Sequence, residues 1–347
     1  MALTSKKRLV LFLLFLFILI GLHRVILPKW PVIGEFHKRQ PAVELSVSQA
    51  AAVTVSGDGQ AGQANDQQFS KPTDSVVFTD DLQGFALDSR GEALSLAATN
   101  DGGVTWQQVH RFPHTTGEEH LAFLNPQTGW LLSGPSSDRK PELQLTSDGG
   151  KTWEVIAGDL PGFDTMIARI SFFRFFDRQN GLIAVQADQD MVLLRTQDGG
   201  LTWSASSRIA LPRQLPGVLA FTTPNDGWLV NGSGAGDQAA ILYRMTDGER
   251  WQSAGKLPER MAAQAISFAD AQTGGILLHA PSAEASWQLL RTQNGGSTWS
   301  MHAFRAGIAL GADVQMSFTS SSIGWLQSRL GFWRTNDGGL SWARQEL

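Results

Sequence analysis

The sequence predicts an all-β fold, a single six-bladed β-propeller preceded by an N-terminal membrane anchor. Three observations lead to this prediction. A short phrase that ends in tryptophan occurs six times, at intervals of about 40 to 50 residues, which is typical of repeat architectures. Short apolar runs separated by turn residues precede each copy. A basic cluster followed by a long apolar run opens the chain.

The repeated phrase has the composition of a tight hairpin. Thr99–Trp106 reads T-N-D-G-G-V-T-W, and further copies span 146–153, 196–203, 292–299 and 335–342, with a shortened one at 246–251. Paired glycines accept positive φ, an aspartate can bond backbone N–H groups two residues on, and a tryptophan can bury its ring across the hairpin. We therefore interpret two positions in each copy as structural. They are Asp101, Asp148, Asp198, Asp247, Asn294 and Asp337, with Trp106, Trp153, Trp203, Trp251, Trp299 and Trp342.

The rest of each repeat supplies three more strands. An apolar triplet such as Leu219–Phe221 comes first, then a polar turn, then a glycine and a second run such as Gly227–Val230. A third run, such as Leu289–Arg291, leads into the phrase, and the tryptophan begins the fourth. Four short strands bounded by turn residues make one propeller blade.

The third repeat departs from this pattern. Its triplet aligns as Ile170–Phe172, and Phe173, Phe175 and Phe176 follow within about three extra residues. Strict strand alternation cannot send all four phenylalanines into the core. We expect the segment to bulge and pack beneath a neighbouring link; the alternative is an exposed apolar contact patch.

The phrase resembles the Asp-box (BNR) repeat of sialidase-like β-propellers. The full unit, with Gly-Trp-Leu runs and Arg-Thr before the box, is most similar to the photosystem II stability and assembly factor-like group. The resemblance covers residues 74–347 and implies a propeller that assists assembly of a membrane complex. Two boxes depart from it: the fourth carries Glu249-Arg250, and the fifth carries Asn294 in place of Asp. We expect the hairpins there to be looser or differently capped.

Three segments follow from this organisation. Residues 1–36 are expected to form a cytoplasmic tip and signal anchor, residues 37–73 a flexible linker, and residues 74–347 the propeller. Because the last tryptophan strand lies at the end of the sequence, we expect either that blade one meets blade six edge to face or that residues 43–55 add strands that close the ring. A seven-bladed ring using those residues is the alternative.

The N-terminus predicts the location. Lys6-Lys7-Arg8 precedes an apolar run over 9–22, which residues 25–27 extend. No small-residue cleavage site follows directly, so we expect an uncleaved, single-pass anchor through residues 9–27 with the propeller outside the cytoplasm. Secretion after cleavage is the alternative.

Composition excludes several functions. The chain has no cysteine, which excludes disulfides and thiolate metal sites. Residues 1–40 hold seven of the 28 Lys and Arg residues and one of the 32 Asp and Glu residues, so the remainder carries 21 basic against 31 acidic side chains. An acidic body is a poor nucleic-acid binder, because that affinity depends on neutralising phosphates.

No catalytic residue or cofactor is predicted. The resemblance to sialidases implies a Tyr nucleophile with acidic partners, but the one tyrosine, Tyr243, falls before the shortened box. His110, His114 and His120, near Glu118 and Glu119, include zinc-ligand types. Pro113 and Gly117 mark that segment as a link, so we expect a solvated loop without metal.

One set of residues is a candidate binding site. An arginine precedes the box in four repeats: Arg195, Arg244, Arg291 and Arg334. Equivalent positions would place these four residues, the arginine stripe, on adjacent blades, where they could bind a partner's carboxylates. The alternative is packing between blades. We therefore predict a non-catalytic extracytoplasmic scaffold for an unidentified protein, with a membrane protein or a glycan as further options; a glycan-binding or sialidase-like hydrolase is the alternative function.

Overall fold

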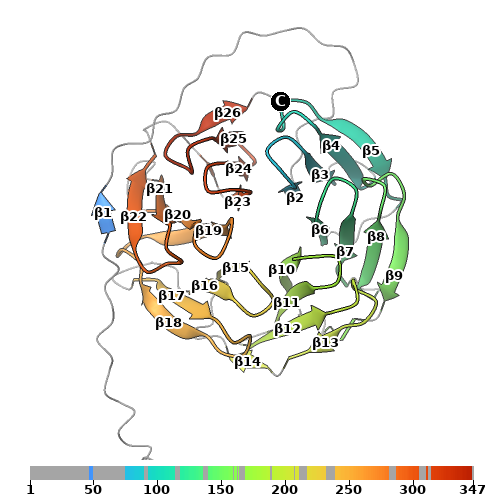
Figure 1. Cartoon of the computed structure of the whole chain (residues 1–347), viewed down its shortest axis with the longest axis horizontal. Helices are drawn as coiled ribbons and strands as arrows, with labels where there is room; N and C mark the ends of the chain where they lie inside the picture. The colour runs from blue at the N-terminus through green and yellow to red at the C-terminus, as the bar shows by residue number, and fades with distance from the viewer. Residues whose placement is uncertain are drawn as a thin grey trace, which may run out of the picture. The chain divides into compact units, whose positions relative to one another are not determined.

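The computed structural model describes residues 47–49, 75–89, 93–113, 118–135, 140–158, 160–161, 163, 169–187, 190–206, 208–210, 217–231, 239–280, 287–304, 310–311 and 314–345. The chain divides into two units, residues 1–42 and 43–347, and all described residues belong to the second. They form six antiparallel sheets arranged as a ring (Figure 1). The prediction of an all-β, six-bladed propeller is confirmed.

Each blade consists of consecutive strands. Blade one holds β2 (Ser75–Phe78), β3 (Gly84–Asp88), β4 (Ser95–Thr99) and β5 (Gln107–Arg111), and blade two holds β6 (Glu119–Phe123), β7 (Gly129–Ser133), β8 (Glu142–Thr146) and β9 (Glu154–Gly158). Blade three holds β10 (Arg169–Phe175), β11 (Gly181–Ala187), β12 (Asp190–Thr196), β13 (Ser204–Ala205) and β14 (Ile209–Ala210), and blade four holds β15 (Val218–Phe221), β16 (Gly227–Asn231), β17 (Ile241–Met245) and β18 (Gln252–Lys256). Blade five holds β19 (Ala262–Phe268), β20 (Gly274–His279), β21 (Trp287–Thr292) and β22 (Trp299–Ala303), and blade six holds β23 (Gln315–Phe318), β24 (Gly324–Ser328), β25 (Gly331–Thr335) and β26 (Ala343–Gln345).

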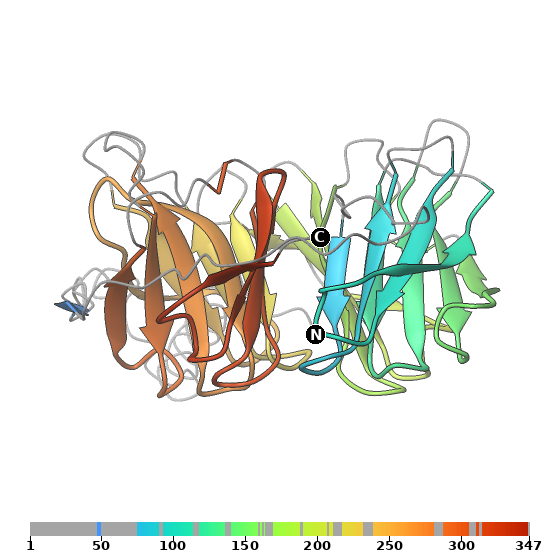
Figure 2. The same ribbon diagram turned by 90° about the horizontal axis from the view of Figure 1, so that it is seen from above.

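The first strand of each blade lies nearest the centre and the last lies at the rim (Figure 1). The start of the second strand pairs with the end of the third, as Gly84 does with Thr99. The inner turn and the box hairpin of every blade therefore lie on the same side of the ring, which we name the Asp-box face. The links between blades lie on the opposite side, the link face (Figure 2).

Blades one and six close the ring by face contact, without a shared strand. Phe78 stacks on Trp325 at a ring-centroid distance of 3.8 Å, with the planes 5° apart. Residues 47–49 form β1 (Val47–Gln49), which pairs in parallel with β22 at the rim of blade five. The expected strand within residues 43–55 thus adds to blade five rather than closing the ring.

Aromatic stacking joins neighbouring blades. The phenylalanine that ends an inner strand stacks on the second strand of the preceding blade: Phe123 lies 3.5 Å from Phe85, and Phe175 lies 3.7 Å from Trp130. Such pairs contribute about 0.5–1.5 kcal/mol beyond their buried area. The same ring covers the glycine that opens its own blade's second strand. A Cβ added at Gly129 would lie 2.6 Å from Phe123, so the phenylalanine and the glycine belong to one packing unit.

The alignment expected for the third repeat is wrong. Phe175, not Phe172, occupies the stacking position, since it pairs with Gly181 and lies on Trp130. The additional residues are absorbed by a register shift between Ile170 and Phe172. Phe172 then contacts Phe221 of blade four, with ring centroids 5.0 Å apart.

The predicted anchor, residues 9–27, lies outside the described residues, as does most of the predicted linker. Among the residues that the structure describes, no helix is long and apolar enough to cross a membrane.

Candidate functional site

Each box hairpin is held closed by its own side chains. In the second box, the Thr146 hydroxyl accepts a hydrogen bond from Gly150 N at 2.9 Å and donates to Asp148 Oδ1, also at 2.9 Å. The Asp148 carboxylate accepts from the backbone N–H of Thr152 at 3.0 Å and from its hydroxyl at 2.6 Å. Trp153 donates through Nε1 to the Gly150 carbonyl at 3.0 Å.

These bonds explain the acidity of two box aspartates. The Thr152 hydroxyl and N–H lower the pKa of Asp148 to about 2, and Thr202 does the same for Asp198. Hydrogen bonds to the ionised form favour it. Both carboxylates therefore stay ionised at neutral pH and are engaged by their own hairpins.

The fourth box departs from the others at a position that the sequence alignment misplaced. Strand register places Met245, not Thr246, where the other boxes have their buried threonine, because Met245 pairs with Gly227 as Thr146 pairs with Gly129. A thioether cannot reproduce the hydroxyl's two bonds. Asp247 instead accepts from the N–H groups of Glu249 and Arg250 at 2.9 and 3.0 Å. The indole N–H of Trp251 has no partner within the described part of the chain.

The arginine stripe lies on four successive blades in equivalent register. Each arginine lies on the third strand of its blade and pairs with the second residue of the second strand. The pairs are Leu182 with Arg195, Trp228 with Arg244, Gly275 with Arg291, and Trp325 with Arg334. All four side chains are half-buried and reach toward the Asp-box face of the next blade.

Two members make two or three hydrogen bonds each, one of them to the box carbonyl of the next blade. Arg195 donates through Nη2 to the Gly248 carbonyl at 2.7 Å and through Nε to Pro224 O at 3.2 Å. Arg244 forms an ion pair with Asp226, with Nε 3.2 Å from Oδ1, and donates to Gly295 O at 3.1 Å. Its guanidinium also lies 4.7 Å from the Trp228 ring centroid. Through Gly248 O and Gly295 O, respectively, Arg195 and Arg244 each join their own blade to the box hairpin of the next blade.

The other two members keep spare donors. Arg291 donates through Nη2 to Ser321 O at 3.1 Å, and Arg334 lies 5.7 Å from the Trp325 ring centroid. Arg334 Nε is buried and has no hydrogen-bond partner among the described residues, so its Nη groups are the donors that a ligand could reach. A guanidinium has five N–H donors. The hydrogen-bonding capacity of the stripe is therefore greatest on blades five and six, and the predicted binding role stays a prediction.

Sequence reasoning missed a contact that blade two, which lacks the arginine, makes to blade three. Blade two has Leu145 in place of the arginine, yet its Trp130 donates through Nε1 to Gly199 O at 3.0 Å. In blade six, Trp325 Nε1 reaches Gly102 O at 3.5 Å. The carbonyl of the first box glycine thus often receives a donor from the preceding blade, whether arginine or tryptophan. The Gly-Trp-Leu run alone does not predict this contact, because Trp228 occupies the same place in blade four and its indole N–H has no partner among the described residues.

The structure does not bring the other candidate residues, the tyrosine and the described histidines, together into one site. Tyr243 lies on β17, the third strand outward in blade four (Figure 1). His110 lies on β5 with Nδ1 3.0 Å from Lys151 O, whereas His120 lies on β6. His114 is outside the described residues. No group of three potential metal ligands occurs within the described ranges.

Glu118 is engaged where blades two and three meet. Its Oε1 accepts a hydrogen bond from Ile170 N at 3.0 Å and lies 3.7 Å from His120 Nε2. Burial raises the pKa of Glu118, but the His120 and Ile170 contacts outweigh it and leave the pKa lowered. This carboxylate is a junction residue, not part of an acid pair.

Comparison with known proteins identifies the fold. No family model and no curated protein matches the chain. A structure of YCF48 bound to D1 peptide is 16% identical over 78% of this chain and 80% of that one, with a TM-score of 0.48. The GH74 xyloglucanase of Xanthomonas campestris is 16% identical over 76% of this chain and 45% of the enzyme, with a TM-score of 0.50. The GH93 α-L-arabinofuranosidase of Fusarium graminearum, in complex with arabinobiose, is 12% identical over 70% and 83%, with a TM-score of 0.47. The resemblance to Asp-box propellers holds at the level of fold, and these neighbours include both binding proteins and glycosidases.

Proposed function

We propose that this protein is a non-catalytic binding protein, held in a membrane by residues 9–27, whose propeller lies outside the cytoplasm and binds a protein partner. The basic cluster at Lys6-Lys7-Arg8 and the apolar run behind it support the anchor. Assembly of a membrane complex is the role that suits a tethered scaffold. The YCF48 structure contains a D1 peptide, but our proposal rests on this chain's own residues.

The observation that carries the proposal is the spare donor capacity of Arg291 and Arg334. Both lie on the Asp-box face, half-buried, in a body that is otherwise acidic. Guanidinium groups bind carboxylates with two parallel hydrogen bonds, and partial burial strengthens such bonds. We infer that acidic side chains of a partner bind at blades five and six, while Arg195 and Arg244 keep the blades together.

Crosslinking and affinity capture from membranes test this inference. The double variant Arg291→Gln/Arg334→Gln is expected to lose the captured partner and to flatten the salt dependence of capture, with an unchanged melting temperature. Arg111→Gln/Arg208→Gln is the matched control, since these exposed arginines lie toward the link face. Equal capture by both variants contradicts the inference.

Two further measurements address the remaining parts of the proposal. Fractionation should recover the full-length chain with membranes, and protease added outside intact cells should digest the propeller; a soluble, N-terminally trimmed main species would instead support secretion. Glycan arrays and glycosidase assays test the alternative function. Turnover of a glycoside by the purified chain would overturn the non-catalytic assignment.

A further inference from the structure

Arg174 is a cation in an unusual position. It lies on β10, the inner strand of blade three, and its side chain is exposed. The guanidinium carbon lies 5.7 Å from the ring centroid of Phe176, and Nη1 is 3.5 Å from the carbonyl of Phe221 in blade four. The equivalent residues of the other five inner strands are small or apolar: Val77, Ala122, Ala220, Ser267 and Ser317.

No acidic side chain compensates this charge among the described residues. Arg244 has an ion pair with Asp226, and the charge of Asp337 acts on Arg291. For Arg174, desolvation alone lowers the pKa. The side chain keeps contact with solvent, yet surrounding protein atoms remove part of its water. Asp177 lies three residues further along the chain, and its carboxylate accepts hydrogen bonds from Gln179 N, Asn180 N and Asn180 Nδ2.

An exposed guanidinium whose one hydrogen bond among the described residues is a long contact to the Phe221 carbonyl keeps N–H donors available to a ligand. We propose that Arg174 and Phe176 form a binding site for a carboxylate that is attached to an apolar group. One guanidinium neutralises one negative charge, so a monoanion fits better than a phosphate dianion, and the planar carboxylate can accept two parallel hydrogen bonds.

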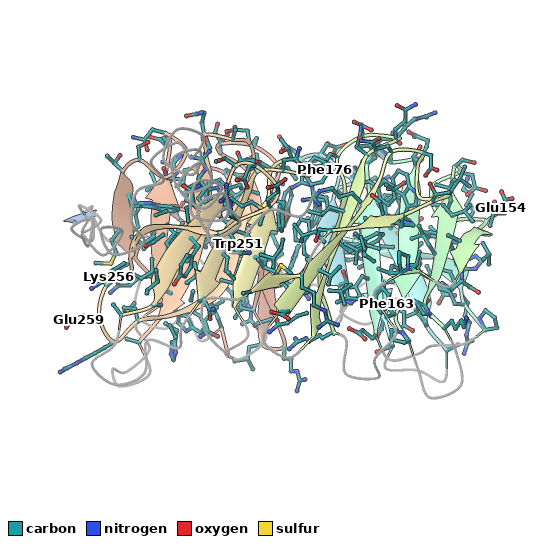
Figure 3. The ribbon with its side chains drawn as sticks, turned by 90° about the horizontal axis from the view of Figure 1, so that it is seen from below. Glu154, Phe163, Phe176, Trp251, Lys256 and Glu259 are labelled. Atoms are coloured by element: carbon teal, nitrogen blue, oxygen red, sulfur yellow. The ribbon has the colours of Figure 1, made fainter. Side chains whose placement is uncertain are left out.

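The apolar part of the ligand has a defined place. Phe172, Phe176, Leu219 and Trp251 are only partly buried and pack on the core between blades three and four. Figure 3 shows Phe176 near the Asp-box side of the ring, with Trp251 deeper in the body. A ligand carboxylate on Arg174 would bring its apolar group against the Phe176 ring. The site lies on blade three and is independent of the spare donors of Arg291 and Arg334.

Benzoate is the probe and benzamide its neutral control, both followed by saturation-transfer NMR on the full-length protein in detergent. We expect saturable binding of benzoate and none of benzamide. Arg174→Gln should weaken benzoate binding by about tenfold or more, and Arg174→Lys by less, because an ammonium cannot form the paired bonds. Arg208→Gln, which removes an exposed arginine paired with Asp190, should leave it unchanged.

Two comparisons separate the outcomes. A short peptide ending in phenylalanine with a free carboxylate, set against its C-terminal amide, distinguishes a chain terminus from a free small acid as the source of the carboxylate. Ligand-free Arg174→Gln should melt close to the wild-type temperature, because the side chain is exposed and makes few contacts. Phe176→Leu keeps the site testable should Arg174→Gln fold poorly, and it should weaken benzoate but not acetate. Equal binding of benzoate and benzamide, or benzoate binding that survives Arg174→Gln, overturns the proposal.

Discussion

The indole nitrogen of Trp130, in blade two, donates a 3.0 Å hydrogen bond to the carbonyl of Gly199 in the box of blade three. One blade later Arg195 does the same for Gly248 at 2.7 Å. Two unlike side chains, one from the second and one from the third strand of its blade, thus bond equivalent box carbonyls in the next blade. The ring is held by a recurring acceptor, and the donor to it varies from blade to blade.

Replacing Trp130 should therefore cost more than replacing its counterpart Trp228. Trp130→Phe keeps an aromatic ring on Phe175 but leaves Gly199 O without its donor, and we expect a loss of about 1 kcal/mol in the free energy of unfolding. Trp228→Phe loses a comparable ring volume but no hydrogen bond, because its indole N–H is buried without a partner among the described residues, so we expect its loss to be smaller by about that 1 kcal/mol. Chemical denaturation of both variants measures the difference. Equal destabilisation would show that ring volume, and not the hydrogen bond, matters.

The buried threonine of the box is expected to be its most important polar residue. Thr146→Val removes the acceptor for Gly150 N and leaves that N–H buried, which should lower the free energy of unfolding by about 1–3 kcal/mol. Thr246→Val is the control, because Thr246 is exposed in the fourth box. Thermal and denaturant unfolding of the two proteins give the comparison. A neutral Thr146→Val would mean that the fourth box, with Met245, loses nothing by lacking the hydroxyl.

Much of this arrangement could be predicted from the sequence. The period of the tryptophans predicted the number of blades, and the box composition predicted the hairpins. The two misalignments arose where a local pattern fitted more than one register. Ile170–Phe172 and Phe173–Phe175 both end in phenylalanine, and only the pairing of Phe175 with Gly181 distinguishes them. Thr246 likewise looked like a box threonine until strand register placed Met245 there.

The contacts between blades could not be predicted, because they join residues far apart in the chain. Nothing in the segment around Trp130 indicates that its indole faces Gly199, 69 residues away. The two roles within the arginine stripe were hidden because they depend on a neighbouring side chain that differs from blade to blade. Arg244 and Arg334 occupy equivalent positions, but the aspartate beside Arg244 comes from its own blade's inner turn, at Asp226.

The glycine beneath each stacked phenylalanine gives a third prediction. Gly129→Ala places a Cβ 2.6 Å from the Phe123 ring, which is sandwiched against Phe85 and cannot move without breaking that stack. We expect a loss of about 1–3 kcal/mol. Gly158→Ala, at the end of β9 with no atom within 4 Å of the new methyl, should be neutral or slightly stabilising. If the melting temperatures of both variants fell equally, the claim that Phe123 and Gly129 pack as one unit would be contradicted.

The fifth box offers a test of the box carboxylates through pH. Asn294 Oδ1 accepts from Thr298 N at 2.9 Å, and its amide donates to the Thr298 hydroxyl at 2.8 Å. In Asn294→Asp the new carboxylate can accept both bonds, as Asp148 does from Thr152. We therefore expect the variant to melt at or above the wild-type temperature at neutral pH.

That gain should depend on pH in a definite direction. The pKa of Asp148 falls from 3.8 to about 2 on folding, and we expect a similar depression at the new carboxylate. A group whose pKa is lower in the folded state stabilises it above the unfolded pKa, and the stabilisation disappears as pH falls through the folded pKa. The melting-temperature difference between Asn294→Asp and wild type should be constant from pH 7 to 5 and vanish between pH 3.8 and about 2. Asp148→Asn, made as the reverse change, should lose stability relative to wild type at pH 7 and recover it over the same interval. A gain in Asn294→Asp that persists undiminished at pH 2 would show that shape, and not ionised hydrogen bonding, is what the box requires of this residue.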